Sequence, residues 1–89
     1  MATLYHVYLS PKQGVTPAQV QAKMDLALDW FKYGDKCWVV CSTSDAAKWQ
    51  TRLRPLVDSD GLLFICKLDV SERQGWMSRK FWDWLQAKA

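Results

Sequence analysis

Two short apolar blocks dominate the hydrophobic pattern of this chain, at residues 37–41 and 62–66. Each is bounded by turn residues and too short for a helix, which is typical of a strand buried on both faces. In a third segment, residues 4–9, the side chains of Tyr5, Val7 and Leu9 alternate with those of Leu4, His6 and Tyr8. This two-residue period predicts the first strand. The segments between the blocks show helical spacing instead, so the pattern indicates an α+β sandwich.

The first helix is predicted by a complete start signal. Thr16 suits the N-cap, Pro17 suits the first helical position, and Gln19 completes a capping box with Thr16. Apolar residues then recur at helical spacing and give one stripe, formed by Val20, Met24, Ala27, Leu28 and Phe31.

A second helix is predicted after Ser44, which suits its N-cap, and Pro55 should kink or end it. Its inward face is predicted to consist of Ala46, Trp49, Leu53 and Val57. A terminal helix should follow Ser78, with Trp82 pointing away from its apolar stripe. That stripe consists of Met77, Phe81, Trp84 and Leu85.

The glycine turn at residues 33–36 favours a hairpin between residues 30–33 and 36–43. The order is then βαββαβ, which predicts a ferredoxin-like antiparallel sheet with an added C-terminal helix, in a single domain over residues 1–89. Without the hairpin, the alternative is a small three-stranded parallel sheet. In the ferredoxin-like arrangement one apolar sheet face needs a cover, either the terminal helix or a second copy of the chain.

Composition narrows the class of protein. The chain has 89 residues, six Trp and a formal charge of +3, with Lys and Arg scattered rather than massed. So many aromatic residues in a small core predict a second interface, and we expect a homodimer. The beginning of the chain has no secretory layout and no segment has the length of a membrane span. We therefore expect a cytoplasmic protein without membrane contact.

Three cysteines, Cys37, Cys41 and Cys66, lie in the apolar blocks, where reduced thiols act as small hydrophobic side chains. Their spacing does not match a zinc ribbon, and His6 is the only histidine. We expect no metal and no cofactor. The chain also contains no nucleophile motif, glycine-rich phosphate loop or paired carboxylates, so no catalytic residue is predicted.

Two sets of residues remain as candidate binding sites. Lys48 and Arg52 are four residues apart on the second helix with Arg54 close by, a spacing suited to nucleic-acid phosphates, but a solvated helix face is the favoured explanation. Tyr5, His6 and Tyr8 on the first strand are a candidate pocket in which His6 would serve as acid or base.

The segment 58–61 (Asp-Ser-Asp-Gly) resembles a cation loop but lacks the further ligands of an EF-hand, so it predicts a helix-to-strand turn. A metal held by Asp58 and Asp60 remains the alternative.

Four segments together resemble a known family: Trp-Phe-Lys-Tyr at 30–33, Lys-Cys-Trp-Val-Val at 36–40, Arg-Leu-Arg-Pro-Leu-Val-Asp-Ser-Asp-Gly-Leu-Leu at 52–63, and Trp-Asp-Trp-Leu at 82–85. They are similar to the SinR-like family of small uncharacterised bacterial proteins, whose fold resembles the small nuclease subunit of the CRISPR adaptation machinery. The resemblance implies a dimer with joined or facing sheets. In the CRISPR relatives the first strand ends in Tyr-Asp, whereas Tyr8 is followed here by Leu9, which offers no oxygen to a divalent metal.

These observations predict a non-catalytic dimeric interaction module that binds a protein or a nucleic acid. The alternative is an enzyme, either a metal-dependent nuclease-like protein or a small-molecule catalyst that uses His6.

Overall fold

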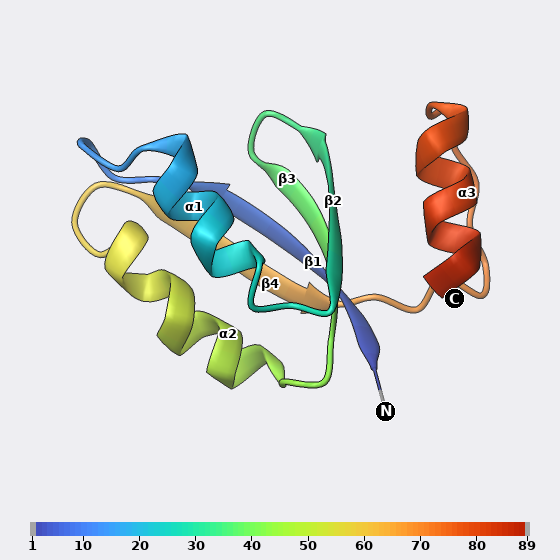
Figure 1. The fold of residues 1–89 in the computed structure, drawn as a ribbon, viewed down its shortest axis with the longest axis horizontal. Helices are drawn as coiled ribbons and strands as arrows, with labels where there is room; N and C mark the ends of the chain where they lie inside the picture. The colour runs from blue at the N-terminus through green and yellow to red at the C-terminus, as the bar shows by residue number, and fades with distance from the viewer. Residues whose placement is uncertain (1, 89) are drawn as a thin grey trace.

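The computed structural model describes residues 2–88 (Figure 1). Four strands and three α-helices follow one another in the order β1, α1, β2, β3, α2, β4, α3, with one 3-10 turn, η1, after α2. Their bounds are β1 Thr3–Ser10, α1 Pro17–Met24, β2 Asp29–Gly34, β3 Cys37–Ser42, α2 Ala46–Leu53, η1 Arg54–Leu56, β4 Leu62–Lys67 and α3 Arg79–Lys88.

The strands form one sheet in the order β2-β3-β1-β4. Every neighbouring pair is antiparallel: β1 with β3, β1 with β4, and β2 with β3. The predicted hairpin is confirmed, because Asp29 to Gly34 pair with Cys37 to Cys41. The alternative of a small parallel sheet is therefore wrong.

The capping box of α1 is present as predicted. The Gln19 backbone N–H donates to Thr16 Oγ1 at 3.2 Å, and the Thr16 backbone N–H donates to Gln19 Oε1 at 2.8 Å. The helix nevertheless ends at Met24, so the longer apolar stripe was wrong beyond that residue. Leu28 is exposed and Phe31 belongs to β2, because hairpin pairing with β3 satisfies that backbone better than a further helical turn.

Helix α2 begins one residue later than expected. Asp45, rather than Ser44, is the N-cap, and its Oδ1 accepts the Lys48 backbone N–H at 2.9 Å. Pro55 ends the α-helix as predicted, and the chain continues through η1 as one tighter turn.

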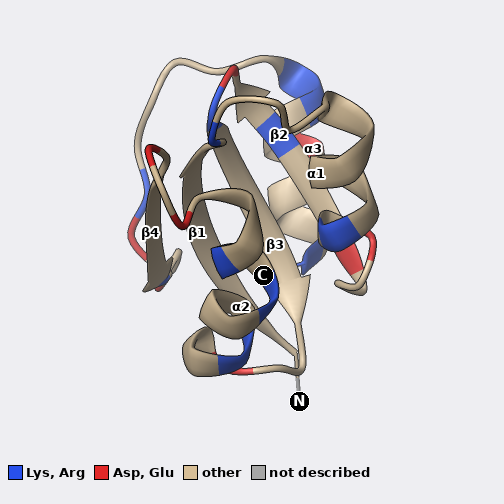
Figure 2. Cartoon of the chain, turned by 90° about the vertical axis from the view of Figure 1, so that its left-hand side faces the viewer, with Lys and Arg blue, Asp and Glu red and all other residues tan. Residues whose placement is uncertain are grey.

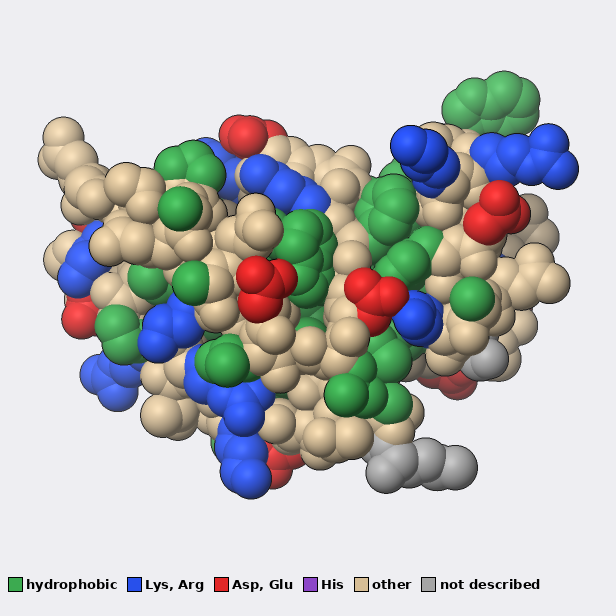
Figure 3. All heavy atoms as spheres, in the orientation of Figure 1, with side chains coloured by type: hydrophobic (Ala, Val, Ile, Leu, Met, Phe, Trp, Pro, Cys, Tyr) green, Lys and Arg blue, Asp and Glu red, His purple; other side chains and the backbone are tan. Residues whose placement is uncertain are grey.

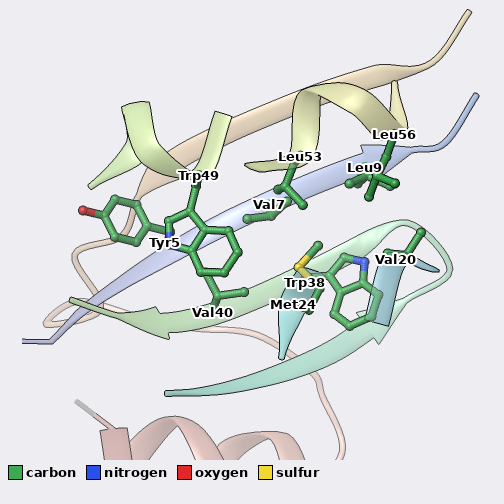
Figure 4. Packing of buried hydrophobic residues seen from close by; sticks show 10 residues of the cluster. All are labelled: Tyr5, Val7, Leu9, Val20, Met24, Trp38, Val40, Trp49, Leu53 and Leu56. Carbon is green, nitrogen blue, oxygen red and sulfur yellow. The ribbon is translucent and has the colours of Figure 1, made fainter. Parts of the chain in front are cut away.

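The main core lies between α1, α2 and one sheet face, and Figure 4 shows its side chains pointing into that space. Val7 and Val40 from the two central strands are fully buried, as are Trp49, Leu53 and Met24 from the helices. The alternation of β1 therefore sends Tyr5, Val7 and Leu9 towards the two helices.

Helix α3 packs on the opposite sheet face. Phe81 and Leu85 are buried there together with Leu4, Val39 and Cys41, and hydrophobic side chains gather along the line where α3 meets the sheet (Figure 3). Trp82 was expected to point away but packs against this cluster, whereas Met77 precedes the helix and is exposed. The sheet residues of this cluster come from β1, β2 and β3.

The position of α3 separates the two apolar blocks. In β3 the prediction of burial on both faces is confirmed for residues 38–41, because α1 and α2 cover one face and α3 covers the other, whereas Cys37 is half-buried. In β4 the same prediction is wrong. Leu63 and Ile65 pack towards the helices, while Leu62 is 63% and Phe64 60% exposed.

None of the helices within residues 2–88 combines the length and the apolar character needed to cross a bilayer.

Candidate interaction surface

One of the two outermost strands of the sheet, β4, leaves large apolar side chains uncovered. Its one paired edge meets β1, and Figure 2 shows it at the rim of the sheet. Residues 62–66 carry no charge, no proline and no register shift against β1. Natural edge strands are usually protected by such features, so β4 presents an unprotected edge to a further strand as far as Lys67, its last residue.

The uncovered surface continues from β4 onto β1. Tyr8 lies opposite Phe64 in the ladder, and His6 lies opposite Cys66. Side chains opposite each other in an antiparallel pair share one face, so Tyr8, Phe64, His6 and Cys66 belong to the sheet face that α3 covers only in part. Leu62 lies two residues before Phe64 and shares this face. We call Leu62, Phe64, Cys66 and Tyr8 the β4 surface.

His6 is linked to the hairpin across β3. Its Nε2 and the Tyr33 hydroxyl are hydrogen-bonded at 2.5 Å, and the two rings are tilted with centroids 5.6 Å apart. Burial lowers the pKa of His6, which favours the neutral imidazole, and burial together with Cys37 raises the pKa of Tyr33. Tyr33 also packs on Phe81 with centroids 5.8 Å apart. The pair therefore joins β1 to β2 beside α3.

The predicted pocket is not formed by its three residues together. Tyr5 is 7% exposed and belongs to the core beneath the helices, whereas His6 and Tyr8 lie on the opposite face. The reason is the two-residue period of a strand, which places neighbouring residues on different faces.

The three predicted phosphate-binding cations diverge in the structure. Lys48 is exposed, but Arg52 is half-buried and its guanidinium carbon lies 4.9 Å from the centroid of the Trp49 ring. Arg54 lines a hollow between α2 and β4 with Gln50. Arg54 begins the 3-10 turn η1, and two positions along a helical backbone differ by about 200°, so the side chains of Arg52 and Arg54 leave the backbone in nearly opposite directions. Figure 2 likewise shows charges distributed over α2 rather than gathered.

Asp58 and Asp60 hold the loop after β1. Lys12 Nζ lies 2.9 Å from Asp58 Oδ1, which keeps the pKa of Asp58 below its usual value. Asp60 Oδ1 accepts the Gln13 backbone N–H at 3.3 Å. Within residues 2–88, His, Cys, Asp and Glu nowhere form a group of three able to hold a metal ion. The segment is a turn between η1 and β4, as predicted.

The apolar residue that stands next to Tyr8 at the end of the first strand is inaccessible. Leu9 is 2% exposed and packs in the core.

The three cysteines are free and differ in environment. Cys41 is buried under α3, Cys37 is half-buried and Cys66 is exposed on β4. The interpretation of all three as buried packing residues was therefore wrong for Cys66, because nothing in the chain covers that side of β4.

The sequence analysis predicts no site at Trp76, which is fully exposed in the segment before α3. It lines a shallow hollow with Phe31, Tyr33 and Met77. The one sequence signal for its exposure is that the residues around Trp76 show neither helical nor strand periodicity.

Comparison of the chain with protein-family models, with curated proteins and with solved structures gives no match.

Proposed function

We propose that this protein is a non-catalytic interaction module that forms a homodimer through β4. The observation that carries the proposal is the exposure of Leu62 and Phe64, at 63% and 60%, in the uncharged stretch 62–66 of the outermost strand β4. Burial of such side chains is worth roughly 25 cal/mol for each Å² of apolar surface, so association is favourable once the backbone edge is also paired.

A second copy fits this edge by symmetry. Two β4 strands related by a twofold axis run antiparallel, and each presents the same row of backbone N–H and C=O groups to the other. The two sheets then join into one of eight strands. Phe64 and Leu62 of each chain come to lie beside those of the partner copy, and this lateral contact removes part of their apolar surface from water.

The strand order β2-β3-β1-β4 with antiparallel neighbours supports a ferredoxin-like topology. The resemblance to the SinR-like family rests on the sequence segments given above and implies the same dimeric assembly. A cytoplasmic location is part of the same proposal.

A further macromolecular partner of the dimer is also proposed, and a protein is better supported than a nucleic acid. Arg52 stacks on Trp49 and Arg54 points to the other side of α2, so the cations do not form one phosphate-binding surface. An enzymatic function is less well supported, because Asp58 and Asp60 bind Lys12 and Gln13 and His6 binds Tyr33.

The test is the solution mass at micromolar concentration, measured by light scattering after size exclusion. We expect twice the mass of one chain for the native protein and a monomer for Phe64→Lys, because the substitution removes the apolar contact and places two like charges side by side across the twofold axis. Leu28→Lys is the matched control: Leu28 is 68% exposed but lies outside the sheet, and its variant should stay dimeric. A monomeric native protein would contradict the proposal.

The enzymatic alternative is tested by incubating labelled RNA and DNA oligonucleotides with the protein and Mg²⁺ or Mn²⁺. We expect no cleavage. Cleavage that disappears in an Asp58→Asn, Asp60→Asn double variant would replace the proposal with a nuclease.

A further inference from the structure

A separate cavity of about 300 Å³ lies on the helix-covered side, between the loop that leads into α1 and the β2–β3 hairpin. Its apolar walls come from Leu9, Pro11, Val15, Val20, Trp30 and Trp38. None of these residues belongs to β4, so this cavity is independent of the proposed dimer contact.

Two tryptophans give the cavity a fixed aromatic wall. Trp30 and Trp38 meet edge to face, with centroids 4.9 Å apart. Trp38 is only 5% exposed, and the indole N–H of Trp30 donates to Asp25 Oδ1 at 2.8 Å. Because burial and this hydrogen bond hold the two rings in place, the wall does not have to rearrange when a planar ligand enters.

The rim of the cavity is cationic. Lys32 and Lys36 line it, against Asp35 as the one carboxylate in the lining. Lys32 Nζ is held 5.3 Å from the centroid of the Trp38 ring. The ion pairs of residues 2–88 join Lys12 to Asp58 and Lys88 to Asp29, so Lys32 and Lys36 remain free to bind an anion.

A hydrogen-bond donor also faces the cavity. Figure 4 shows the indole nitrogen of Trp38 on the side of its ring nearer Leu9 and Val20, which both line the cavity. Trp30 and Trp84 donate their indole N–H groups to carboxylates, but within residues 2–88 Trp38 has no such partner. A ligand oxygen is therefore the natural acceptor for this group.

We propose that this cavity binds a small planar aromatic carboxylate. The volume is at the lower end for ligand sites and suits one or two fused rings. The rings lie against Trp30 and Trp38, and the carboxylate accepts hydrogen bonds from Lys32 and from the Trp38 indole. The single carboxylate of the lining leaves the rim with a net positive charge, which selects an anion over a neutral or cationic ring.

The experiment titrates the full chain with 2-naphthoate and with its neutral isostere, 2-naphthamide, followed by ¹H–¹⁵N NMR. We expect the largest shifts at the Trp38 indole N–H and at the backbone amides of Val20 and Lys32, with little change in β4. The carboxylate should bind with a dissociation constant below about 1 mM and at least about fivefold more tightly than the amide.

Three variants locate the contact. Lys32→Gln should weaken 2-naphthoate binding by about fivefold, as expected for an exposed ion pair, and leave 2-naphthamide binding unchanged. Lys48→Gln, an exposed lysine on α2, is the matched control and should have no effect. Gln21→Trp fills the cavity from its exposed rim and should abolish binding while the melting temperature stays within a few degrees.

Equal affinity for acid and amide, or an unchanged affinity in Lys32→Gln, would contradict the anion site. Shifts that map to residues outside the cavity would overturn its location. The absence of any shift at millimolar 2-naphthoate would overturn the proposal as a whole.

Discussion

Trp84 of α3 donates its indole N–H to Asp29 of β2, with 3.1 Å between Nε1 and Oδ2. The same carboxylate oxygen lies 2.8 Å from Lys88 Nζ. Together with the contact between Phe31 and Phe81, these bonds hold α3 over the β2 side of the sheet. The position of this helix decides which strand stays uncovered, and that strand is β4.

Changing Asp29 to Asn removes the charge that Lys88 binds. The hydrogen bond from Lys88 is the largest cause that holds the pKa of Asp29 below its usual value of 3.8, with smaller contributions from Trp30 and Trp84, while burial opposes them. A carboxyl with a lowered folded-state pKa stabilises the fold above the unfolded value and loses that contribution as the pH falls through the folded-state pKa.

We therefore expect Asp29→Asn to lower the free energy of unfolding at pH 7 by less than about 1 kcal/mol, because the pair is partly exposed. The difference should vanish at a pH well below 3.8. Urea denaturation of both proteins at neutral and acid pH measures it. A difference that persists in acid would show that Asp29 acts through packing.

Phe81→Ala should loosen α3 from the sheet. Phe81 is 9% exposed, and its centroid lies 5.4 Å from that of Phe31. Loss of a buried ring typically costs about 3 to 5 kcal/mol, a large share of the stability of a small domain. Trp76→Ala is the control and should change stability by less than about 0.5 kcal/mol, because Trp76 is fully exposed. Equal denaturation curves for the two variants would mean that α3 is not part of the fold.

Local signals in the sequence predicted much of this fold. The capping box of Thr16 and Gln19 begins α1, and Pro55 ends α2, because both effects act within one helical turn. The hairpin was also predicted, since its turn and its apolar strands are close in sequence.

The surface exposure of β4 was not predictable in the same way. Residues 37–41 and 62–66 have equally apolar patterns, yet only the first block is covered on both faces. The difference depends on where α3 packs, and its contacts join residues far apart in sequence, such as Trp84 and Asp29, which are 55 residues apart. The aromatic cavity was missed for the same reason, because Leu9, Val20 and Trp38 come from three separate elements.

Gly61→Ala should be destabilising because the backbone is crowded there. An added Cβ would lie 2.6 Å from the Ser10 carbonyl oxygen and 2.7 Å from Val57 Cα. Both atoms belong to the backbone, so relief requires a shift of β1 or of Val57 after η1, and we expect a loss of about 1 to 3 kcal/mol. Gly75→Ala, whose Cβ would meet only the Trp82 ring at 3.5 Å, should be nearly neutral. Thermal melting compares the two, and a neutral Gly61→Ala would refute this account of the turn.

The cysteines should react with a thiol reagent at three different rates. In the monomeric Phe64→Lys variant we expect Cys66 to react fast, Cys37 more slowly, and Cys41 only on unfolding, following their exposure. In the native protein Cys66 should become slower as the protein concentration rises, because dimer formation covers β4. A Cys66 rate that does not depend on concentration would argue against its place in the contact.

Amide hydrogen exchange along β4, residues 62–67, tests the central claim most directly. The amides that point away from β1 have no strand partner within residues 2–88, so they exchange quickly in a monomer. If two β4 strands pair, these amides should be protected at high protein concentration and lose protection on dilution or in Phe64→Lys. Fast exchange of these outward amides in a sample whose mass is that of a dimer would contradict the claim, because the two chains would then associate through another surface.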